Sequence, residues 1–288
     1  MIRSTNAAVE LGGRLSRDIG RFGAWRRRGD IDQKMAVELE AMGFGAIWVG
    51  GSPEGDLAQI GELLDVTDRI VIATGIVNMW REDAETVAEG FHRLAELHPG
   101  RFLLGLGIGH RESTQEYRRP LEKMSDYLDR LDQASVPAEE VVLAALGPRA
   151  LRLAADRTAG AHPYLTTPRH TAYARGVLGN GPLLAPEQKV ILGVGPDRVR
   201  SVGRSILARY LRLVNYRKNL MREGWSEDDL EDGGSDALVD SLVLHGDAET
   251  VAGSLVAHLE AGADHIAIQV IGEDPLPAYR VLAGTLIG

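Results

Sequence analysis

Amphipathic helical segments alternate along this chain of 288 residues with short, almost continuously apolar segments. Apolar runs too short for a helix are typical of strands that are buried on both faces, as in a parallel sheet. We expect eight strands, at about Asp18–Ala24, Ala46–Val49, Arg69–Ile76, Phe102–Leu106, Val141–Ala145, Ala161–Leu165, Lys189–Val194 and His265–Val270. Regular alternation of strand and helix gives right-handed crossovers, and eight such units match a (β/α)₈ barrel, the TIM-barrel fold.

A doubly wound open sheet uses the same alternation, so the pattern by itself leaves that rival fold open. The stretch from about Arg198 to Leu244 is too long for one strand–helix unit. It contains a predicted helix near Val199–Arg222 followed by a polar segment. We interpret residues 198–244 as an insertion into a single domain that spans residues 1–288.

Two predicted helices have recognisable capping residues. Asp30 with Gln33 fits a capping box for a helix over Ile31–Met42, and Gly43 supplies its end. Asp247 is expected to cap the helix before the last strand.

The composition excludes several functional classes. There is no cysteine, which rules out disulfides and thiolate chemistry, and the net charge of −9 argues against a general nucleic-acid binder. No apolar run approaches the roughly 20 residues that cross a bilayer, and no signal-peptide core is present. The histidines lack the spacing of a helical metal site, and no nucleophile elbow occurs. We therefore expect a cytoplasmic protein without a membrane, nucleic-acid or metal partner.

In a (β/α)₈ barrel the active site is built from loops after the C-terminal ends of the strands. The candidate side chains and glycines in these loops are Trp25, Gly50, Asn78, Trp80, His110, Gly147, Arg149 and Thr166. His110 is the candidate for proton transfer, because imidazole changes charge near neutral pH; a solvated loop histidine is the alternative. We expect His162 to be a core residue and His258 to lie on a helix surface or turn.

Glycine-rich segments follow three of the predicted strands. Gly75 indicates close approach to the backbone, and Asn78 is either a polar contact to a ligand or a turn residue. In GLGIG, His110 stands where a dinucleotide-binding fingerprint needs its last glycine, so these glycines serve strand packing or a flat ring laid on the backbone. The Gly147–Pro148 turn either holds a phosphate together with Arg149 or is a simple turn.

Several segments together resemble the bacterial-luciferase-like superfamily of flavin and deazaflavin oxidoreductases. They occur in the family's order and cover most of the chain from Gly43 to Gln269: GFGAIWVGG, RIVIATGIVNMW, HPGRFLLGLGIGH, AALGPRALRLAADRTAG and HGDAETVAGSLVAHLEAGADHIAIQ. ATGIVNMW, with GLGIGH and YRRPLEKMSDYLD, looks most similar to the actinobacterial branch that uses coenzyme F420.

The resemblance implies a (β/α)₈ barrel and hydride transfer through a reduced deazaflavin or FMN. It also implies a bulge with a non-proline cis peptide at Gly75–Ile76, which backs the ring beside Asn78. Some relatives have an acidic acid–base residue where this chain has His110. The family's phosphate-side loops correspond to Leu146, Gly147 and Arg149, and to Leu165 and Thr166.

The chain departs from the family after the second strand. Many relatives have an acidic residue or a histidine there, whereas this chain has Gly50, Gly51 and Ser52. The segment AGAH at Ala159–His162 also lacks the aspartate of a turn that is common in relatives. The resemblance therefore implies the fold and the cofactor class, and it does not extend to the substrate.

We expect an F420-dependent oxidoreductase that transfers a hydride between the deazaflavin and an unidentified small organic substrate. Trp25, Gly50 and Trp80 would line the substrate pocket, with His110 exchanging a proton. The protein's share would be orientation and electrostatics, since the hydride chemistry belongs to the cofactor. An FMN-dependent monooxygenase and a cofactor-binding protein without catalysis are the alternatives. A homodimer is the expected assembly.

Overall fold

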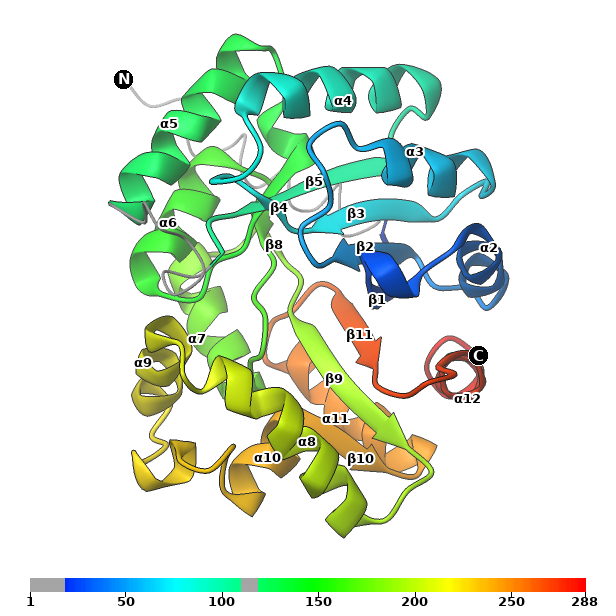
Figure 1. The fold of residues 1–288 in the computed structure, drawn as a ribbon, viewed down its shortest axis with the longest axis vertical. Coiled ribbons are helices and arrows are strands. Elements are labelled where there is room, and N and C mark those ends of the chain that lie inside the picture. Colours follow the sequence, from blue (N-terminus) through cyan, green and yellow to red (C-terminus); the bar gives the residue numbers. More distant parts are fainter. Residues whose placement is uncertain (1–18, 110–118) are drawn as a thin grey trace.

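The computed structural model describes residues 19–109 and 119–288, in which helices surround a curled parallel sheet (Figure 1). The strands are β1 (Phe22–Arg27), β2 (Ala46–Gly50), β3 (Val71–Gly75), β4 (Val77–Asn78), β5 (Phe102–Gly107), β6 (Val141–Leu143), β7 (Gly160–Ala161), β8 (Leu183–Leu184), β9 (Glu187–Leu192), β10 (Val243–Gly246) and β11 (Ile266–Val270). The α-helices are α2 (Gln33–Ala41), α3 (Ala58–Asp65), α4 (Ala84–Leu97), α5 (Pro120–Gln133), α6 (Pro148–Arg157), α7 (Pro168–Leu178), α8 (Pro196–Tyr210), α9 (Val214–Arg222), α10 (Asp236–Leu242), α11 (Ala248–Glu260) and α12 (Leu276–Leu286).

The strands are parallel and follow the order β10-β9-β11-β1-β2-β3-β5-β6-β7-β8, with β4 beside β5. Two residues separate β8 from β9, and they join the two sides of the sheet. Ala185 donates its N–H to Ala161 O at 2.9 Å, and Pro186 O accepts from Ala267 N at 2.9 Å. The segment from β8 to β9 therefore closes the barrel between β7 and β11. The predicted (β/α)₈ barrel is confirmed, and the doubly wound open sheet is excluded.

Two strands include a buried charged residue that the prediction left out. The first is Phe22–Arg27 and not Asp18–Ala24, because Arg26 is buried in the strand, where its guanidinium donates to Val270 O at 2.9 Å. The seventh begins earlier than Lys189, since the charged Glu187 is also buried. In both cases a charged side chain with a buried partner concealed part of the strand.

Capping of two helices follows from the local sequence. The predicted cap of the first helix is wrong: Asp32, and not Asp30, accepts from Met35 N at 2.8 Å, because Arg28–Asp30 forms a separate 3₁₀ turn. Asp247 caps α11 as predicted, accepting from Thr250 N at 2.9 Å.

The region interpreted as an insertion forms α8, α9, α10 and β10. The single helix predicted near Val199–Arg222 is wrong, because α8 ends at Tyr210 and α9 starts at Val214. The break lets Leu211 and Leu213 both be buried in a core shared by the three helices. These helices lie together at one end of the molecule, and α4 and α5 lie at the other (Figure 1).

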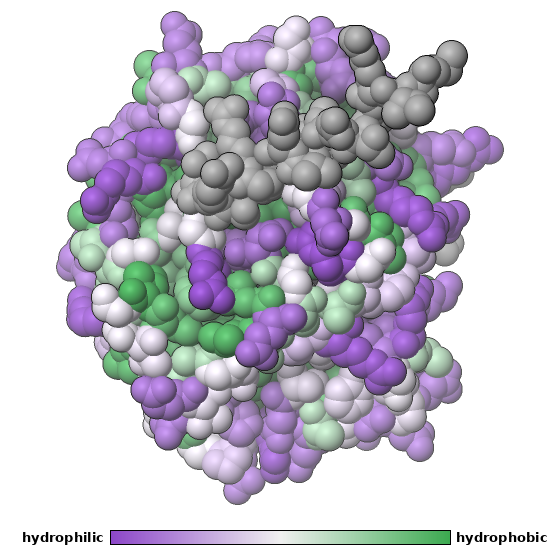
Figure 2. Space-filling view, turned by 180° about the vertical axis from the view of Figure 1, so that it is seen from behind, coloured by the Kyte–Doolittle hydropathy of each residue, from purple (hydrophilic) through white to green (hydrophobic). Residues whose placement is uncertain are grey.

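Two hydrophobic layers flank the barrel wall. One fills the space between the strands and the surrounding helices, and the other fills the barrel interior around Trp25, Trp48 and Leu103. Seen from behind, hydrophobic residues gather in a hollow that is bordered by hydrophilic side chains (Figure 2). No helix among the described residues is both long and apolar enough to span a membrane.

Candidate functional site at the C-terminal end of the barrel

A β-bulge interrupts the pairing between the third and fourth strands of the barrel. Ala73 pairs with Leu103 and Val77 pairs with Leu106. The chain from Ala73 to Val77 therefore contains one residue more than the segment of β5 opposite to it, which defines the bulge. Thr74 spans the interruption, because its hydroxyl accepts from Gly105 N and donates to Gly105 O, each at 2.8 Å. The bulge therefore lies at Thr74–Ile76, between β3 and β4.

The peptide bond between Gly75 and Ile76 is cis, as the family resemblance predicted. Both residues are half-buried, whereas the preceding Thr74 is fully buried. Because β3 ends at Gly75, this peptide bond lies at the C-terminal end of the strand, at the mouth of the barrel. The role of these residues in cofactor binding stays a prediction.

Asn78 acts as a turn residue beyond the bulge. It is buried, and its side-chain oxygen accepts from Trp80 N at 2.9 Å. Its side-chain nitrogen lies 2.8 Å from the position that a Cβ would take at Gly109, which has a φ of +56°. Asn78 therefore stabilises its own turn and lies so close to Gly109 that a side chain would not fit there. Its predicted contact with a cofactor ring stays a prediction.

Trp25, Gly50 and Gly75 lie together inside the barrel mouth. Gly50 pairs with Gly75, and the Trp25 indole occupies the space beside Gly50, where an added Cβ would come within 1.9 Å of the ring. Trp25 belongs to β1 rather than to the loop after it, which corrects the predicted position. Gly50 therefore leaves room for an aromatic side chain.

Trp80 lies on the side of this region that faces α5. Lys123 on α5 places its Nζ 5.5 Å from the centroid of the Trp80 ring. His110, the predicted acid–base residue, lies outside the described residues. Among residues 19–109 and 119–288, no group of three His, Asp or Glu side chains could hold a metal ion.

His162 is buried inside the barrel, as predicted. Its Nδ1 donates to Ala185 O at 2.6 Å, and its ring stacks on Trp48 with 4.1 Å between centroids. Burial lowers the pKa of His162 to about 4, so the ring is neutral at physiological pH. Trp48 in turn donates its Nε1–H to His265 Nε2 at 3.0 Å. These three rings form a fixed layer below the barrel mouth.

The N-terminus of α6 has no side-chain cap in the described part of the chain. Gly147 is the N-cap, and Pro148 occupies the first position of the helix as predicted. Among the described residues, nothing lies within 4 Å of the position of a Cβ at Gly147, and Arg149 is exposed. Free N–H groups, the helix dipole and a guanidinium are the elements that bind phosphate.

The N-terminus of α7 already has a carboxyl group of the protein beside it. Thr167 caps α7 by accepting from His170 N at 3.2 Å, and its hydroxyl donates to Glu223. Burial raises the pKa of Glu223 to about 7. Leu165 and Thr166, the second predicted phosphate-side loop, are buried. Of the two predicted phosphate loops, the one at Gly147 is the more accessible.

His170 joins these two loops. It is fully buried, and its Nε2 donates to Leu146 O at 3.0 Å. The loop that ends in Gly147 is thus attached to the first turn of α7. Sequence reasoning did not identify His170, which lies on a helix with no distinguishing motif.

A buried ion pair lies in the barrel wall beside the mouth. Lys189 Nζ is 2.9 and 3.0 Å from the two carboxylate oxygens of Glu187, and neither side chain is more than 1% exposed. Lys189 Nζ also lies 3.9 Å from the centroid of the Tyr164 ring, and Leu165 N donates to Glu187 at 3.2 Å. Burial raises the pKa of Glu187, whereas Lys189 lowers it. The spacing of two residues along a strand places both charges on one face, a signal that the sequence contained.

The predicted surface position of His258 is wrong. His258 is fully buried, because it continues the inward stripe of α11 that contains Val251 and Leu255. Its Nε2 lies 2.9 Å from Gln188 Oε1, and its Nδ1 lies 2.8 Å from Thr171 Oγ1. The imidazole thus links α11, α7 and β9 outside the barrel.

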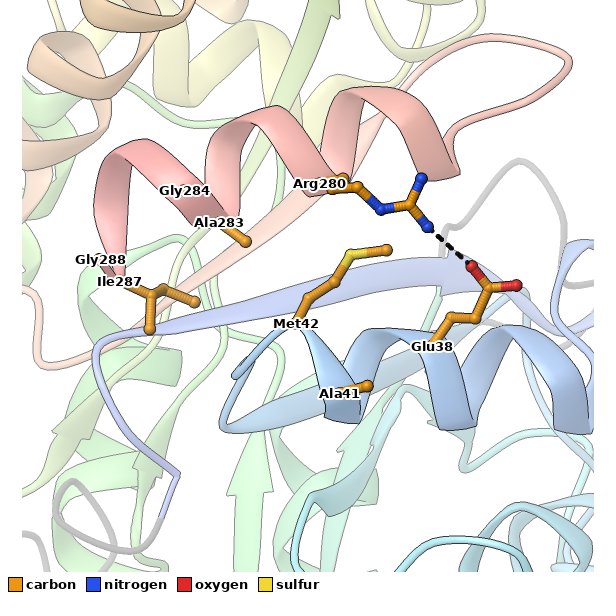
Figure 3. A pocket seen from close by; sticks show the side chains of 8 residues that line it. All are labelled: Glu38, Ala41, Met42, Arg280, Ala283, Gly284, Ile287 and Gly288. Carbon is orange, nitrogen blue, oxygen red and sulfur yellow. Dashed lines mark hydrogen bonds and ion pairs between the residues drawn. The ribbon is translucent and has the colours of Figure 1, made fainter.

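A surface groove of 390 Å³ lies between α2 and α12, at the other end of the barrel (Figure 3). Met42 and Ile287 line its apolar side, and Arg280 donates to Glu38 at 3.1 Å across it. The groove lies beside the start of β2, since α2 runs back along the barrel wall before that strand begins. It is therefore separate from the region around Gly75.

Comparison with known proteins defines the family. The chain belongs to the luciferase-like monooxygenase family, whose model matches residues 32–177, just over half of the chain. N-acetyl-S-alkylcysteine monooxygenase of Bacillus subtilis (strain 168) is 32% identical over an alignment of 115 residues, and the match covers 34% of this chain and 34% of that protein. The match spans about a third of that relative. It therefore does not show that this chain has the relative's activity.

Solved structures share the fold at low sequence identity. An F420-dependent secondary alcohol dehydrogenase, in complex with an F420–acetone adduct, has a TM-score of 0.73 at 15% identity and covers 92% of this chain and 97% of its own. The F420-dependent tetrahydromethanopterin reductase of Methanopyrus kandleri has a TM-score of 0.68 at 14% identity, covering 93% and 98%. The oxygenating constituent of 3,6-diketocamphane monooxygenase from Pseudomonas putida, in complex with FMN, has a TM-score of 0.65 at 14% identity, covering 91% and 95%. The fold is thus that of luciferase-like oxidoreductases.

Proposed function

We propose that this protein is an F420-dependent oxidoreductase that transfers a hydride between the deazaflavin and a small organic substrate, and that it belongs to the actinobacterial branch of its family. The observation that carries the proposal is the half-buried backbone at Gly75–Ile76, at the end of the barrel where such folds build their active sites. Two of the solved structures with this fold are F420-dependent enzymes. The homodimer and the cytoplasmic location are part of the same proposal.

The residues around this backbone fit a flat, phosphorylated cofactor. The ring would lie against Gly75–Ile76, and its phosphate side would meet the uncapped N-terminus of α6 and Arg149. When bound, the cofactor supplies the hydride chemistry. The protein's part is to bind the ring, orient it and exclude water, with Trp25, Gly50 and Trp80 on the substrate side.

Titration of the purified protein with F420 and with FMN, followed by fluorescence, tests the cofactor. We expect F420 to bind at least about tenfold more tightly than FMN, a difference of about 1.4 kcal/mol. Arg149→Ala should weaken F420 binding by a similar factor, because it removes a charge-assisted contact to phosphate. Arg152→Ala is the matched control, since Arg152 is also exposed on α6. Equal affinities for F420 in wild type and Arg149→Ala would remove Arg149 from the site.

An FMN-dependent monooxygenase is the second candidate, favoured by the family match and the FMN-bound relative. Tight FMN binding without F420 binding would select it over our proposal. Cofactor binding of normal affinity without turnover on any substrate of a broad panel would instead favour a cofactor-binding protein.

His110 is proposed as the acid–base residue, on the strength of its position after β5. His110→Ala should lower turnover well over tenfold and leave cofactor affinity near the wild-type value, because general acid–base catalysis contributes about 10²–10⁴-fold. Steady-state kinetics and a cofactor titration measure both. His92→Ala, at an exposed histidine on α4, is the control. Unchanged turnover of His110→Ala would exclude His110 from the mechanism.

A further inference from the structure

Three consecutive arginines stand at the end of β1, and the middle one has no partner among the described residues. Arg26 is buried and donates to Val270 O at 2.9 Å, and Arg28 forms an ion pair with Glu54. Arg27 is exposed and makes no hydrogen bond or ion pair within the described part of the chain. Because β1 ends at Arg27, its guanidinium group lies at the C-terminal end of the barrel.

Arg27 shares the inner face of β1 with Trp25. Ala24 packs outside the barrel wall, whereas Trp25 packs inside it. Successive side chains of a strand point to opposite faces, so Arg27 also lies on the inner face, two residues closer to the mouth. The Trp25 ring fills the interior beside Gly50 on β2. A ligand at Arg27 therefore lies above the Trp25 ring and needs no space beside it.

Gln269 lies on the inner face of the neighbouring strand, β11. Ile268 packs outside the barrel wall, so the next residue, Gln269, points inward. Ala24 pairs with Ile268, so Gln269 lies level with Trp25, and Arg27 stands one inward-facing position closer to the mouth. The two polar side chains thus face the mouth from adjacent strands.

The Gln269 amide is held by its oxygen, and its nitrogen is left without a partner. Tyr164 OH donates to Gln269 Oε1 at 3.1 Å, and Tyr210 OH lies 3.1 Å from Tyr164 OH. Gln269 Nε2 has no hydrogen-bond partner among the described residues, and it is not enclosed, since Gln269 keeps 8% of its surface exposed. Because polar groups buried to this extent are nearly always paired, this N–H group points to a ligand that accepts hydrogen bonds.

A ligand that satisfies both groups must be an acceptor with negative charge. The Arg27 guanidinium and the Gln269 amide nitrogen have only donors, and a carboxylate has only acceptors and pairs well with arginine. The phosphate proposed for the cofactor would bind at Arg149, after β6. β2, β3 and β5 separate β1 from β6, so Arg27 and Arg149 lie on different sides of the mouth and serve different anionic groups.

We propose that the substrate is an organic acid whose carboxylate is bound by Arg27 and Gln269. The Arg27 guanidinium donates to the carboxylate oxygens, and Gln269 Nε2–H donates to one of them. The inference rests on the proposed function, because it concerns the small organic substrate of that hydride transfer. It adds the chemical class of the substrate and the side of the mouth at which its charged end is held.

Benzoate and benzamide are matched probes, because they have nearly the same shape and differ in charge. Isothermal titration calorimetry at pH 7.5 is made with the protein saturated with whichever of F420 and FMN it binds. Wild type should bind benzoate at least about tenfold more tightly than benzamide. Arg27→Gln should remove this preference, and Arg27→Lys should keep part of it, because lysine retains the charge without the paired donors.

Arg21→Gln is the matched control, since Arg21 is exposed and directly precedes β1 at the other end of the barrel. It should bind both probes as the wild type does. Gln269→Met has a side chain of similar length without an N–H, and it should bind benzoate about tenfold more weakly and benzamide with little change. Near-ultraviolet circular dichroism and thermal unfolding confirm that each variant is folded.

The outcomes separate this inference from the proposed function. If the protein binds a cofactor but wild type and Arg27→Gln bind benzoate equally well, only the carboxylate site is overturned. If the protein binds neither F420 nor FMN, the proposed function is overturned, and the same titrations on the protein alone still test Arg27. A loss of cofactor affinity in Arg27→Gln would overturn the inference, because it would place the cofactor's phosphate, and not a substrate, at Arg27.

Discussion

Lowering the pH from 8 to 5 is expected to reduce the free energy of unfolding by about 5 kcal/mol, a large part of the about 5–15 kcal/mol typical of a folded protein. Four buried histidines cause the loss. Burial lowers the pKa of each to about 4; they are His162, His170, His258 and His265. In the unfolded chain the same residues titrate near 6.5.

The direction of this pH dependence follows from the number of protons that the folded and unfolded states bind. Between pH 6.5 and pH 4 the unfolded chain takes up protons on these histidines and the folded protein does not, so acidification favours unfolding. At pH 5 each buried histidine lowers the free energy of unfolding by about 2 kcal/mol relative to neutral pH. Glu223 acts in the opposite direction, because burial raises its pKa to about 7 and the folded protein protonates it first. The stabilisation from one carboxyl group of this kind offsets the destabilisation caused by about one buried histidine.

Urea unfolding at a series of pH values between 8 and 5 measures this dependence. His258→Gln should remove about a quarter of the histidine contribution, because the variant lacks one of the four buried groups. His92→Gln is the control, since His92 is exposed. Stability that stays constant down to pH 5 would contradict the expected protonation states of the buried imidazoles.

Lys189→Met should destabilise the protein by about 3–5 kcal/mol, the cost of leaving one charge of a buried pair without its partner. Glu187 is fully buried, and Lys189 supplies two of its hydrogen bonds. Without the ammonium group, Leu165 N is the one hydrogen-bond donor left to this carboxylate among the described residues. Chemical denaturation at pH 7.5 measures the loss.

The double variant Glu187→Gln/Lys189→Met tests whether the charge, rather than the shape, is responsible. It should be considerably more stable than Lys189→Met, because replacing a buried pair by neutral groups is often nearly neutral. Glu122→Gln breaks the exposed pair with Arg119 and should leave stability unchanged, since exposed ion pairs contribute little. A double variant no more stable than Lys189→Met would show that packing, not charge, accounts for the loss.

Periodicity predicted the alternation of buried strands and amphipathic helices, because the causes of that pattern are local. A parallel strand buried on both faces must be apolar, and the helix that follows must have one apolar face, so both leave a pattern in the sequence. Gly147–Pro148 likewise predicted the start of α6, since a proline is favoured at the first position of a helix. Family resemblance added the cis peptide at Gly75–Ile76, which no periodicity indicates.

Periodicity did not predict the charged residues that are buried in strands. Arg26 and Glu187 are polar by type, and their burial depends on Val270 O and Lys189, which only the folded chain brings to them. His258 was misplaced for the same reason, since Gln188 and Thr171 come to it from other elements.

The sequence by itself determined the order of strands and helices, the glycines at the barrel mouth and the start of α6, because these follow from local sterics and from burial of a periodic face. Only the tertiary structure decided which polar groups meet across the barrel. It brought Trp25 and His162 together beside Gly75 and left one ring nitrogen of each without a hydrogen-bond partner among the described residues. Hydrogen-bond pairing is a property of positions in space, and residues 137 apart along a chain carry no local signal of it.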